Sequence, residues 1–442
     1  YDRWAGFAPK GVGNSRQLLK RMPDRRLHQT STATKHSGSS RLRPVAVAAI
    51  MVVGFMSYGT YRGLLPMPLR LGGNSTRTDV TQIAATPADS ESVITAVATV
   101  TEHRTVSGLL KLPAPDAAGV VVLRSGQAYE ASALEFSGVM HIESTGEQLA
   151  VVKVTTAAPW SVKANQVAFN NVQIQEHAEG IVDANGARPA LLDCQCDVLS
   201  MRKCIVYSDV DDVLVRWSTL ANSASVVSIQ DSILRGRRTG VWLTSATQRC
   251  TIRNTLFQQV SAIRCDTVSD RTSTINFNVS HVTQVGGHGF LDVVSSAQQS
   301  TEARIEIECG ESVLAPSLAL VRLAGGKGWT PAGTQVAFLL PERGNPTIIP
   351  PNVNPAVQFD RSLNQLVALP DNQVTAESLL LADPVFRTVK DGEDPLFAFQ
   401  LIDYEGPTLS LRLPGVDVAA LPAFLFDDLR HATEDNLSPT GR

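Results

Sequence analysis

The stretch VSIQDSIL, residues 227–234, and the stretch CTIRNTLF, residues 250–257, share one arrangement of apolar and turn-forming residues. Each stretch has apolar residues at its first, third and eighth positions and an Asp or Asn at its fifth position. Two apolar residues that are two positions apart lie on one face of a strand. Asp and Asn tolerate the left-handed backbone of a sharp corner. The pattern therefore predicts a strand, a corner and a second strand.

This pattern returns about every 28 residues between Val167 and Ile307. Aligned, the repeats form three apolar columns and one corner position. The first column is Val167, Leu199, Val227, Cys250, Ile275 and Ile305. The second is Phe169, Met201, Ile229, Ile252, Phe277 and Ile307. The third is Ile174, Val206, Leu234, Phe257 and Val282. The corner position holds Asn171, Lys203, Asp231, Asn254, Val279 and Cys309.

A repeated strand-turn-strand unit buries its apolar face only by stacking on its neighbours. The intervals in the second column are 32, 28, 23, 25 and 30 residues, which is normal where loops of varying length leave a stack of strands. We therefore expect an all-β fold with parallel β-helix coils over residues 91–330. A further strand set is expected at Leu191–Cys194, Val213–Val215, Val241–Leu243, Ala262–Cys265, Phe290–Val293 and Leu318–Leu323.

The chain beyond residue 330 has a different composition. Of the 24 prolines in the full chain, 13 lie between Pro331 and Pro439, and proline does not serve in central strands. Residues 331–442 are therefore expected to form an irregular C-terminal region that packs on the last coils.

The N-terminal part predicts a membrane anchor. Residues 1–43 hold ten Lys or Arg against Asp2 and Asp24, a net charge of +8. The 18 residues from Pro44 to Tyr61 carry no charge, and as a helix they would reach about 27 Å, which spans a bilayer. The basic excess before this run predicts a cytoplasmic, disordered tail and an extracytoplasmic bulk. A cleavable signal peptide or a buried core helix is the alternative. Residues 62–90 are expected to be a linker.

The columns and corner Asn residues over residues 95–325 resemble the right-handed parallel β-helix of the pectin-lyase-like superfamily. The order of basic tail, anchor and β-helix also resembles large bacterial cell-envelope proteins, some of which carry a Ser/Thr kinase before the membrane. No kinase motif is present in these 442 residues. The chain begins at Tyr1 rather than Met, so we expect a fragment or processed form, for example the outer part of a longer signalling protein.

Enzymes of this superfamily supply candidate catalytic residues by resemblance. Polygalacturonase-type glycosidases share an Asp pair, a Gly-His-Gly and an Arg-Ile-Lys, which Asp211-Asp212, Gly287-His288-Gly289 and Arg304-Ile305-Glu306 match in part. His288 lies 76 residues after Asp212, about three coils. Three spacings of about 4.8 Å would hold the two groups about 14 Å apart. A turn at the Asp pair and a surface bend at His288 are therefore the favoured interpretation, and a catalytic site of Asp211, Asp212 and His288 is the alternative.

Other sites receive little support. Asp209, Asp211 and Asp212 form the one candidate calcium site. A solvated turn is the favoured interpretation, because three acidic residues in four are common in such turns and calcium needs about six to eight oxygen ligands. The Gly-x-Ser-x-Gly and phosphate-binding loop motifs are absent, so no cofactor is expected. The basic tail lacks interleaved aromatics, so nucleic acid is not an expected partner. The cysteines are expected to be small buried hydrophobes with free thiols: Cys194, Cys196, Cys204, Cys250, Cys265 and Cys309.

Two function classes remain. The first is a membrane-anchored, non-catalytic envelope protein whose β-helix binds a polysaccharide or an envelope protein, or acts as a spacer. The second is a polysaccharide lyase or glycoside hydrolase of the pectin-lyase-like superfamily. A cleft that gathers acidic and basic residues from neighbouring coils would mark a site. Exposed aromatics would favour sugar binding, and the candidates are Trp160, Trp217, Trp242 and Trp329.

Overall fold

A computed structural model of the protein separates residues 1–95 from a compact second unit, residues 96–442. The structure describes residues 105, 108–177, 188–220, 225–245, 249–267, 273–295, 303–325, 331, 333–342, 344–353, 356–362, 365–390, 393–403 and 413–423. The basic tail, the apolar run of residues 44–61, the linker and Trp329 lie outside these residues. Within the described ranges, no helix has the length and apolar character to cross a membrane.

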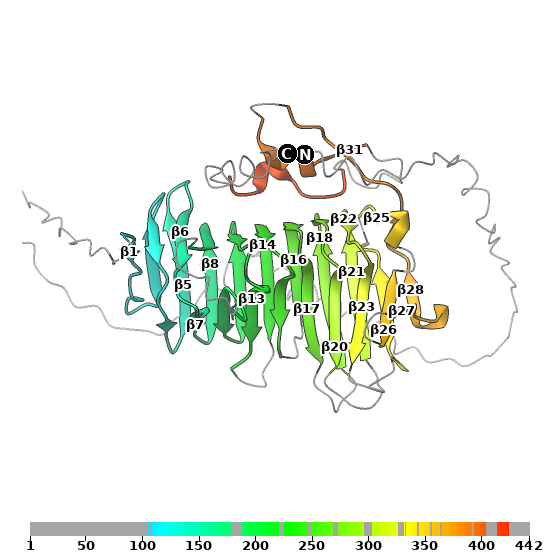
Figure 1. The fold of residues 1–442 in the computed structure, drawn as a ribbon, viewed down its shortest axis with the longest axis horizontal. Helices are drawn as coiled ribbons and strands as arrows, with labels where there is room; N and C mark the ends of the chain where they lie inside the picture. The colour runs from blue at the N-terminus through cyan, green and yellow to red at the C-terminus, as the bar shows by residue number, and fades with distance from the viewer. Residues whose placement is uncertain are drawn as a thin grey trace, which may run out of the picture. The chain divides into compact units, whose positions relative to one another are not determined.

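The second unit is a stack of coils, and its strands form three parallel ladders (Figure 1). A typical coil contributes one strand to each ladder. The first ladder runs through β2 (Val120–Arg124), β5 (Val139–Thr145), β8 (Gln166–Asn170), β11 (Val198–Arg202), the first halves of β14 (Val226–Arg235) and β16 (Arg249–Gln258), β18 (Ser273–Ser280), β21 (Ala303–Gly310), β24 (Gln335–Leu339) and β28 (Val374–Ala376).

The second ladder runs through β1 (Leu110–Lys111), β3 (Ala128–Glu130), β6 (Ala150–Val154), β9 (Val172–Glu176), β12 (Ile205–Tyr207), the second halves of β14 and β16, β19 (Thr283–Val285), β22 (Val313–Ala315), β25 (Thr347–Ile349) and β29 (Leu379–Leu381). The third ladder runs through β4 (Leu134–Glu135), β7 (Trp160–Lys163), β10 (Leu192–Gln195), β13 (Val213–Ser218), β15 (Thr239–Leu243), β17 (Ser261–Thr267), β20 (Gly289–Ser295), β23 (Ala319–Gly325) and β26 (Val357–Ser362), with antiparallel β27 (Gln365–Ala368) at its end. These long parallel sheets are compatible with the expected β-helix.

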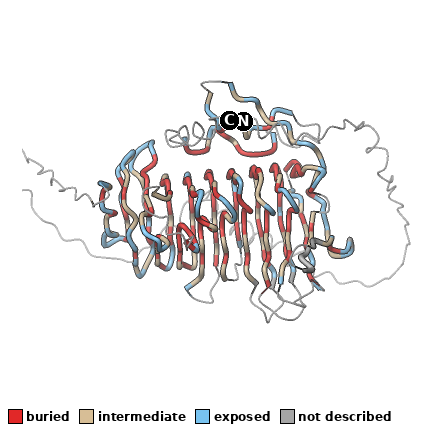
Figure 2. Tube along the Cα trace, in the orientation of Figure 1, coloured by how far each residue is buried: buried red, intermediate tan, exposed pale blue. Residues whose placement is uncertain are grey.

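Many strand residues are buried (Figure 2), and the apolar side chains among them fill the interior between the ladders. Trp160 and Trp217 lie in this core and are 2% and 0% exposed. All six cysteines are buried with free thiols, as expected. Burial raises the pKa of the Cys196, Cys204 and Cys265 thiols to about 12, so these thiols stay protonated at neutral pH.

The apolar columns are confirmed through Ile252, but their last two rows are shifted by two residues. Cys250 pairs with Phe277 rather than Ile275, and Ile252 pairs with Val279 rather than Phe277. The pattern of apolar residues could not predict this two-residue shift. Residues two apart in β18 share one face, so both registers bury apolar side chains.

The corner position shows the true register. The non-glycine residues at the corners between the first and second ladders have positive φ: Asn171 (59°), Lys203 (51°), Asp231 (49°), Asn254 (44°), His281 (54°) and Glu311 (52°). His281 and Glu311 therefore replace Val279 and Cys309 as corner residues. In the third column Gln284, not Val282, pairs with Phe257, and it is followed by Leu314.

The coils continue past residue 330 to β29, and two further strand levels extend the first and second ladders despite the prolines. The segment after them returns along the stack, as the orange-to-red ribbon in Figure 1 shows. It contains β30 (Val385–Phe386) and β31 (Leu401–Asp403), which pair antiparallel, and the short 3-10 helices η6 (Pro395–Phe399) and η7 (Val418–Ala420).

This C-terminal segment covers apolar side chains on the outer face of the second ladder. One buried cluster contains Leu149, Ile205, Ile233 and Leu256 from the coils and Leu396, Val416, Val418 and Leu421 from the segment. The Asp417 N–H donates to Asn254 Oδ1 at 2.7 Å, and the Val416 N–H donates to Thr283 Oγ1 at 3.0 Å. The segment therefore packs on middle coils. A second buried cluster of Leu401 with Val313 and Ile348 shows that it also packs on the last coils, as the sequence led us to expect.

Candidate functional site

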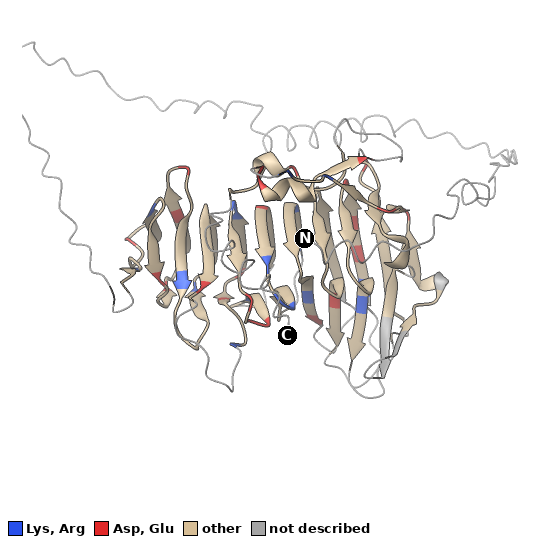
Figure 3. Ribbon diagram, turned by 45° about the horizontal axis from the view of Figure 1, so that its top comes forward, with Lys and Arg blue, Asp and Glu red and all other residues tan. Residues whose placement is uncertain are grey.

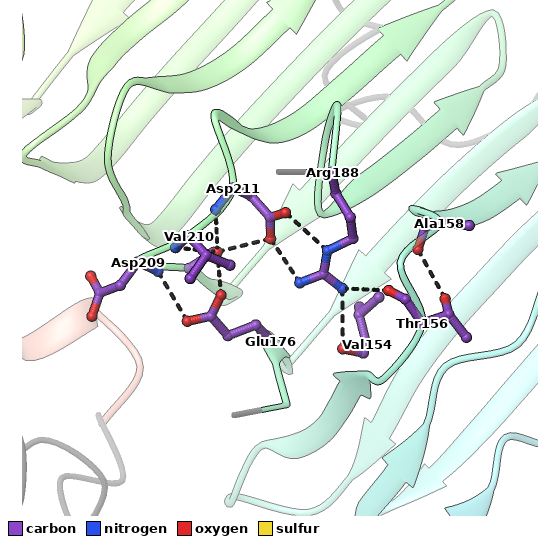
Figure 4. Close-up of polar contacts among 9 residues, drawn as sticks. Val154, Thr156, Ala158, Glu176, Arg188, Asp209, Val210 and Asp211 are labelled. Carbon is purple, nitrogen blue, oxygen red and sulfur yellow. Dashed lines mark hydrogen bonds and ion pairs between the residues drawn. The ribbon is translucent and has the colours of Figure 1, made fainter. Parts of the chain in front are cut away.

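Asp211, one of the expected catalytic residues, is part of a buried ion pair. The Arg188 guanidinium donates from Nε to Asp211 Oδ1 at 2.9 Å and from Nη2 to Oδ2 at 3.0 Å. The two side chains are 1% and 0% exposed. Arg188 Nη1 also donates to the carbonyl oxygens of Val154 and Thr156, both at 3.1 Å, so the pair connects neighbouring coils (Figure 4). Both oxygens of the Asp211 carboxylate are therefore buried against Arg188.

Hydrogen bonds hold the rest of the acidic turn in place. Ser208 Oγ lies 2.7 Å from Glu176 Oε2 and 2.8 Å from Asp211 Oδ2, and it accepts from the Asp211 N–H at 3.0 Å. The Asp209 N–H donates to Glu176 Oε1 at 3.2 Å, and Tyr207 donates its hydroxyl to the Asp209 carboxylate. No group of three or more His, Cys, Asp or Glu within the described ranges could hold a metal ion, the Asp209, Asp211 and Asp212 turn included.

Asp212 and His288 do not converge. Asp212 pairs with Arg238 at 3.1 Å, and both side chains are largely exposed. The register of the third ladder places the residues before β13, β15, β17 and β20 on successive coils, so His288 lies three coils from Asp212. Three spacings amount to about 14 Å, beyond the separation of about 5–9.5 Å at which two catalytic groups flank one glycosidic bond.

The tryptophans that the structure describes, Trp160, Trp217 and Trp242, do not form an exposed platform. Trp160 and Trp217 are core residues, and Trp242 lies half-buried on the outer face of the third ladder. The Arg264 guanidinium stacks over the Trp242 ring at 4.5 Å, and the Trp242 Nε1–H donates to Asp266 at 2.9 Å. The ring face that stacks on Arg264 is therefore occupied.

Charged side chains on the outer face of the third ladder are largely paired across coils. Asp193 and Arg216 approach to 2.6 Å, which raises the pKa of Arg216. Asp292 and Arg322 are 3.6 Å apart, and burial raises the pKa of Asp292. These pairs connect coils along the stack, and charged positions of both signs lie on neighbouring strands (Figure 3). Because the charges neutralise one another in place, few remain for a ligand.

The outer face of the first ladder is different, because it carries a groove of about 630 Å³ over β16, β18, β21 and β24. The side chains between the inward columns point outward and form rows. One row is Arg249, Asn276 and Glu306, and the next is Thr251, Asn278, Glu308 and Leu339. Arg253, Ser280, His281 and Glu311 complete the polar lining. We call this feature the groove.

The groove has a cationic side and an acidic side. Neither Arg249 nor Arg253 has an ion-pair partner among the described residues. Two strands away, Glu306 pairs with Arg304 at 2.7 Å and Glu308 accepts from Asn278 Nδ2 at 3.0 Å. At the corner, His281 Nε2 lies 2.7 Å from Glu311 Oε2. The amides and hydroxyls between the two sides both donate and accept hydrogen bonds.

Sequence reasoning named Glu306 only by resemblance and missed the remaining residues of the groove. A usable signal existed, since the residues between two inward columns must point outward. In the strands before Asn254, His281 and Glu311 these positions hold Arg, Thr, Asn, Ser and Glu rather than apolar residues. The two-residue register error concealed the rows.

Comparison with known proteins identifies no relative. No protein-family model matches the chain, no curated protein is significantly similar to it, and no solved structure matches its fold at a significant level.

Proposed function

We propose that the protein is a membrane-anchored, extracytoplasmic binding protein whose coils hold a neutral, hydroxyl-rich polysaccharide chain in the groove. The observation that carries this proposal is the lining of the groove, in which arginines, amides and carboxylates follow one another across adjacent strands. The fold that we infer is the right-handed parallel β-helix of the pectin-lyase-like type. The residues proposed as the anchor are 44–61, with the basic tail in the cytoplasm.

The charge balance of the groove favours a neutral ligand. Arg249 and Arg253 contribute two positive charges. Arg304, which pairs with Glu306 of the lining, adds a third. Glu306, Glu308 and Glu311 contribute three negative charges. A polyanion that met the arginines would also meet the carboxylates, and like charges in close contact are unfavourable.

Hydroxyl groups suit this lining because each can donate to a carboxylate and accept from a guanidinium or amide. A sugar chain that lies across the strands would offer such groups at every residue. Four strands at about 4.8 Å spacing give a length of about 14 Å, enough for several contacts. The polar groups of the groove that have no protein partner are solvated in the free protein, so a ligand must reproduce the hydrogen bonds of the water that it displaces, and hydroxyl groups can do this.

Hydrolysis or lyase chemistry is the alternative function. It would have to use groups other than the expected ones, because Asp211 is buried in an ion pair and Asp212 is far from His288. We therefore expect no release of reducing ends or unsaturated products from pectin or other polysaccharides. Turnover that is lost in both His288→Ala and Asp212→Asn would contradict the separation of these residues.

Affinity electrophoresis tests the proposed binding. The detergent-solubilised full chain is run through gels that contain neutral or acidic polysaccharides, and we expect retardation by a neutral polymer. Asn278→Ala should weaken it about 3- to 10-fold, the effect of one hydrogen bond. Asn170→Ala changes the same residue type on the same face of β8, outside the groove, and should leave it unchanged. Retardation of Asn278→Ala equal to that of the wild type, or retardation by acidic polymers alone, would refute the proposal.

The proposed anchor has a separate test. Protease added outside spheroplasts should digest sites after Arg62 and spare the basic tail, because the positive-inside rule keeps that tail in the cytoplasm. Loss of the tail with protection of the coils would overturn the orientation.

A further inference from the structure

A second cavity of about 270 Å³ lies at the ridge between the second and third ladders. The lining residues come from the turns of successive coils: Arg237, Arg238, Gln259, Gly287, His288 and Ser317. We call this feature the ridge cavity. The groove lies on the outer face of the first ladder, so the two sites share no residue.

The stacking of the turns creates this cluster. The Ser261 N–H donates to the Arg238 carbonyl at 2.7 Å, and the Leu318 N–H donates to the His288 carbonyl at 3.2 Å. These bonds hold the turns before β15, β17, β20 and β23 at adjacent levels. Gly287 has a φ of 76°, and a Cβ there would lie 2.1 Å from the Val260 carbonyl oxygen. Glycine therefore permits the close approach of these two turns, and the donors of four coils are brought together.

The ridge cavity is rich in hydrogen-bond donors and positive charge. Arg237 has no ion-pair partner among the described residues. Arg238 uses Nη1 to contact Asp212 at 3.1 Å, which leaves further N–H groups of its guanidinium available. The His288 imidazole and the Gly287 N–H likewise donate to no other described residue. Ser317 donates to the Gly287 carbonyl at 2.7 Å and so fixes the turn.

The guanidinium groups of Arg237 and Arg238 carry two positive charges, and the Asp212 carboxylate that pairs with Arg238 carries one negative charge, so these three groups have a net positive charge. Guanidinium groups bind oxyanions with paired hydrogen bonds, and oriented backbone N–H groups at turns add to such sites. A tetrahedral oxyanion has an oxygen available for each of the directions from which these donors come, whereas a carboxylate has two oxygens. The size of the ridge cavity is also sufficient for such a group.

We propose that the ridge cavity binds a tetrahedral oxyanion, either as a free phosphate or sulfate ion or as a phosphate or sulfate ester on a larger molecule. Arg237 and Arg238 hold the charge, while Gln259, Gly287 and His288 donate to its remaining oxygens. This site is separate from the proposed polysaccharide site and does not depend on it.

Isothermal titration of the detergent-solubilised full chain with inorganic phosphate, sulfate and a sugar phosphate tests the proposal. At least one of these should bind, and Arg237→Ala should weaken its binding about tenfold or more, since it removes a charged hydrogen bond. Arg202→Ala removes another exposed arginine from the coils and should leave binding unchanged. Tighter binding of the sugar phosphate identifies an ester, and equal or tighter binding of an inorganic ion identifies the free anion.

Folding and the proposed polysaccharide site are controlled in the same series. Arg237→Ala should melt at the wild-type temperature, because the side chain is exposed. Asn278→Ala should leave anion binding unchanged, so failure at one site is distinguishable from failure at the other. The proposal is overturned if none of the three anions binds, or if Arg237→Ala and Arg202→Ala have equal effects.

Discussion

Replacing Asp211 by Asn should strongly destabilise the coils, because it removes the charge that neutralises a buried guanidinium. Arg188 is 1% exposed at its side chain and Asp211 is 0% exposed. The substitution keeps the shape of the side chain but leaves the positive charge of Arg188 without its counter-ion. Breaking a buried ion pair in this way costs about 3–5 kcal/mol of the free energy of unfolding.

The neighbouring residue offers a matched control. Asp212→Asn makes the same chemical change one position later, where the Arg238 and Asp212 side chains are 63% and 40% exposed. Solvent screens a pair of this kind, and its contribution is about 0–1 kcal/mol. A double variant, Arg188→Met with Asp211→Leu, removes both buried charges and should recover most of the stability lost in Asp211→Asn.

Urea denaturation of the full chain measures these effects, with the fluorescence of the buried Trp160 and Trp217 as the signal. We expect a loss of about 3–5 kcal/mol for Asp211→Asn and of less than about 1 kcal/mol for Asp212→Asn. Equal small losses in both variants would refute the buried ion pair. Such a result would also return Asp211 to the set of residues that a ligand could reach.

Three further predictions concern the core, its thiols and the C-terminal segment. Ile252→Asp places a charge between Ile229 and Val279 and should unfold the coils or abolish expression; a variant that melts like the wild type would contradict the register. Burial raises the pKa of the Cys265 thiol from 9.0 to about 12, so above pH 9 the unfolded chain loses this proton while the folded chain keeps it. The free energy of unfolding should therefore fall between pH 9 and pH 12, by up to about 1.4 kcal/mol per buried thiol and pH unit, and a profile that is flat there would be inconsistent with burial. Asn254→Ala removes the acceptor of the Asp417 N–H and should speed proteolysis of the C-terminal segment without melting the coils; unchanged proteolysis would show that this contact is unimportant.

The sequence predicted the strand stack because inward columns and corner residues repeat along the chain. The register failed at Phe277, since a strand with apolar residues at 275, 277 and 279 has two equally apolar alignments. The positive φ of His281 and Glu311 shows which of the two alignments is present. His and Glu do not predict a corner from the sequence as Asn does. The prediction that the coils end at residue 330 was wrong because the prolines after it lie in turns between strands, where they do not interrupt a ladder.

The candidate site was harder to predict than the fold. The partial match to known motifs pointed to Asp211 and His288. In the structure, Asp211 is buried and the strand register places His288 three coils away. The groove depends on which outward positions of four distant strands become neighbours, for example Arg249, Asn276 and Glu306. An error of two residues in register places different side chains in each row. The ion pair of Asp211 with Arg188 was equally hard to predict from the sequence, because it joins residues of different coils.

The measurement that tests the central claim most directly is calorimetric titration of the full chain with neutral oligosaccharides of increasing length, at low and high salt. A polar groove that takes an uncharged chain predicts affinity that rises until the oligosaccharide spans about 14 Å and then levels off. It also predicts little change with ionic strength, because no net charge is neutralised on binding. Absence of binding at every length, or affinity that falls steeply with salt, would contradict the account.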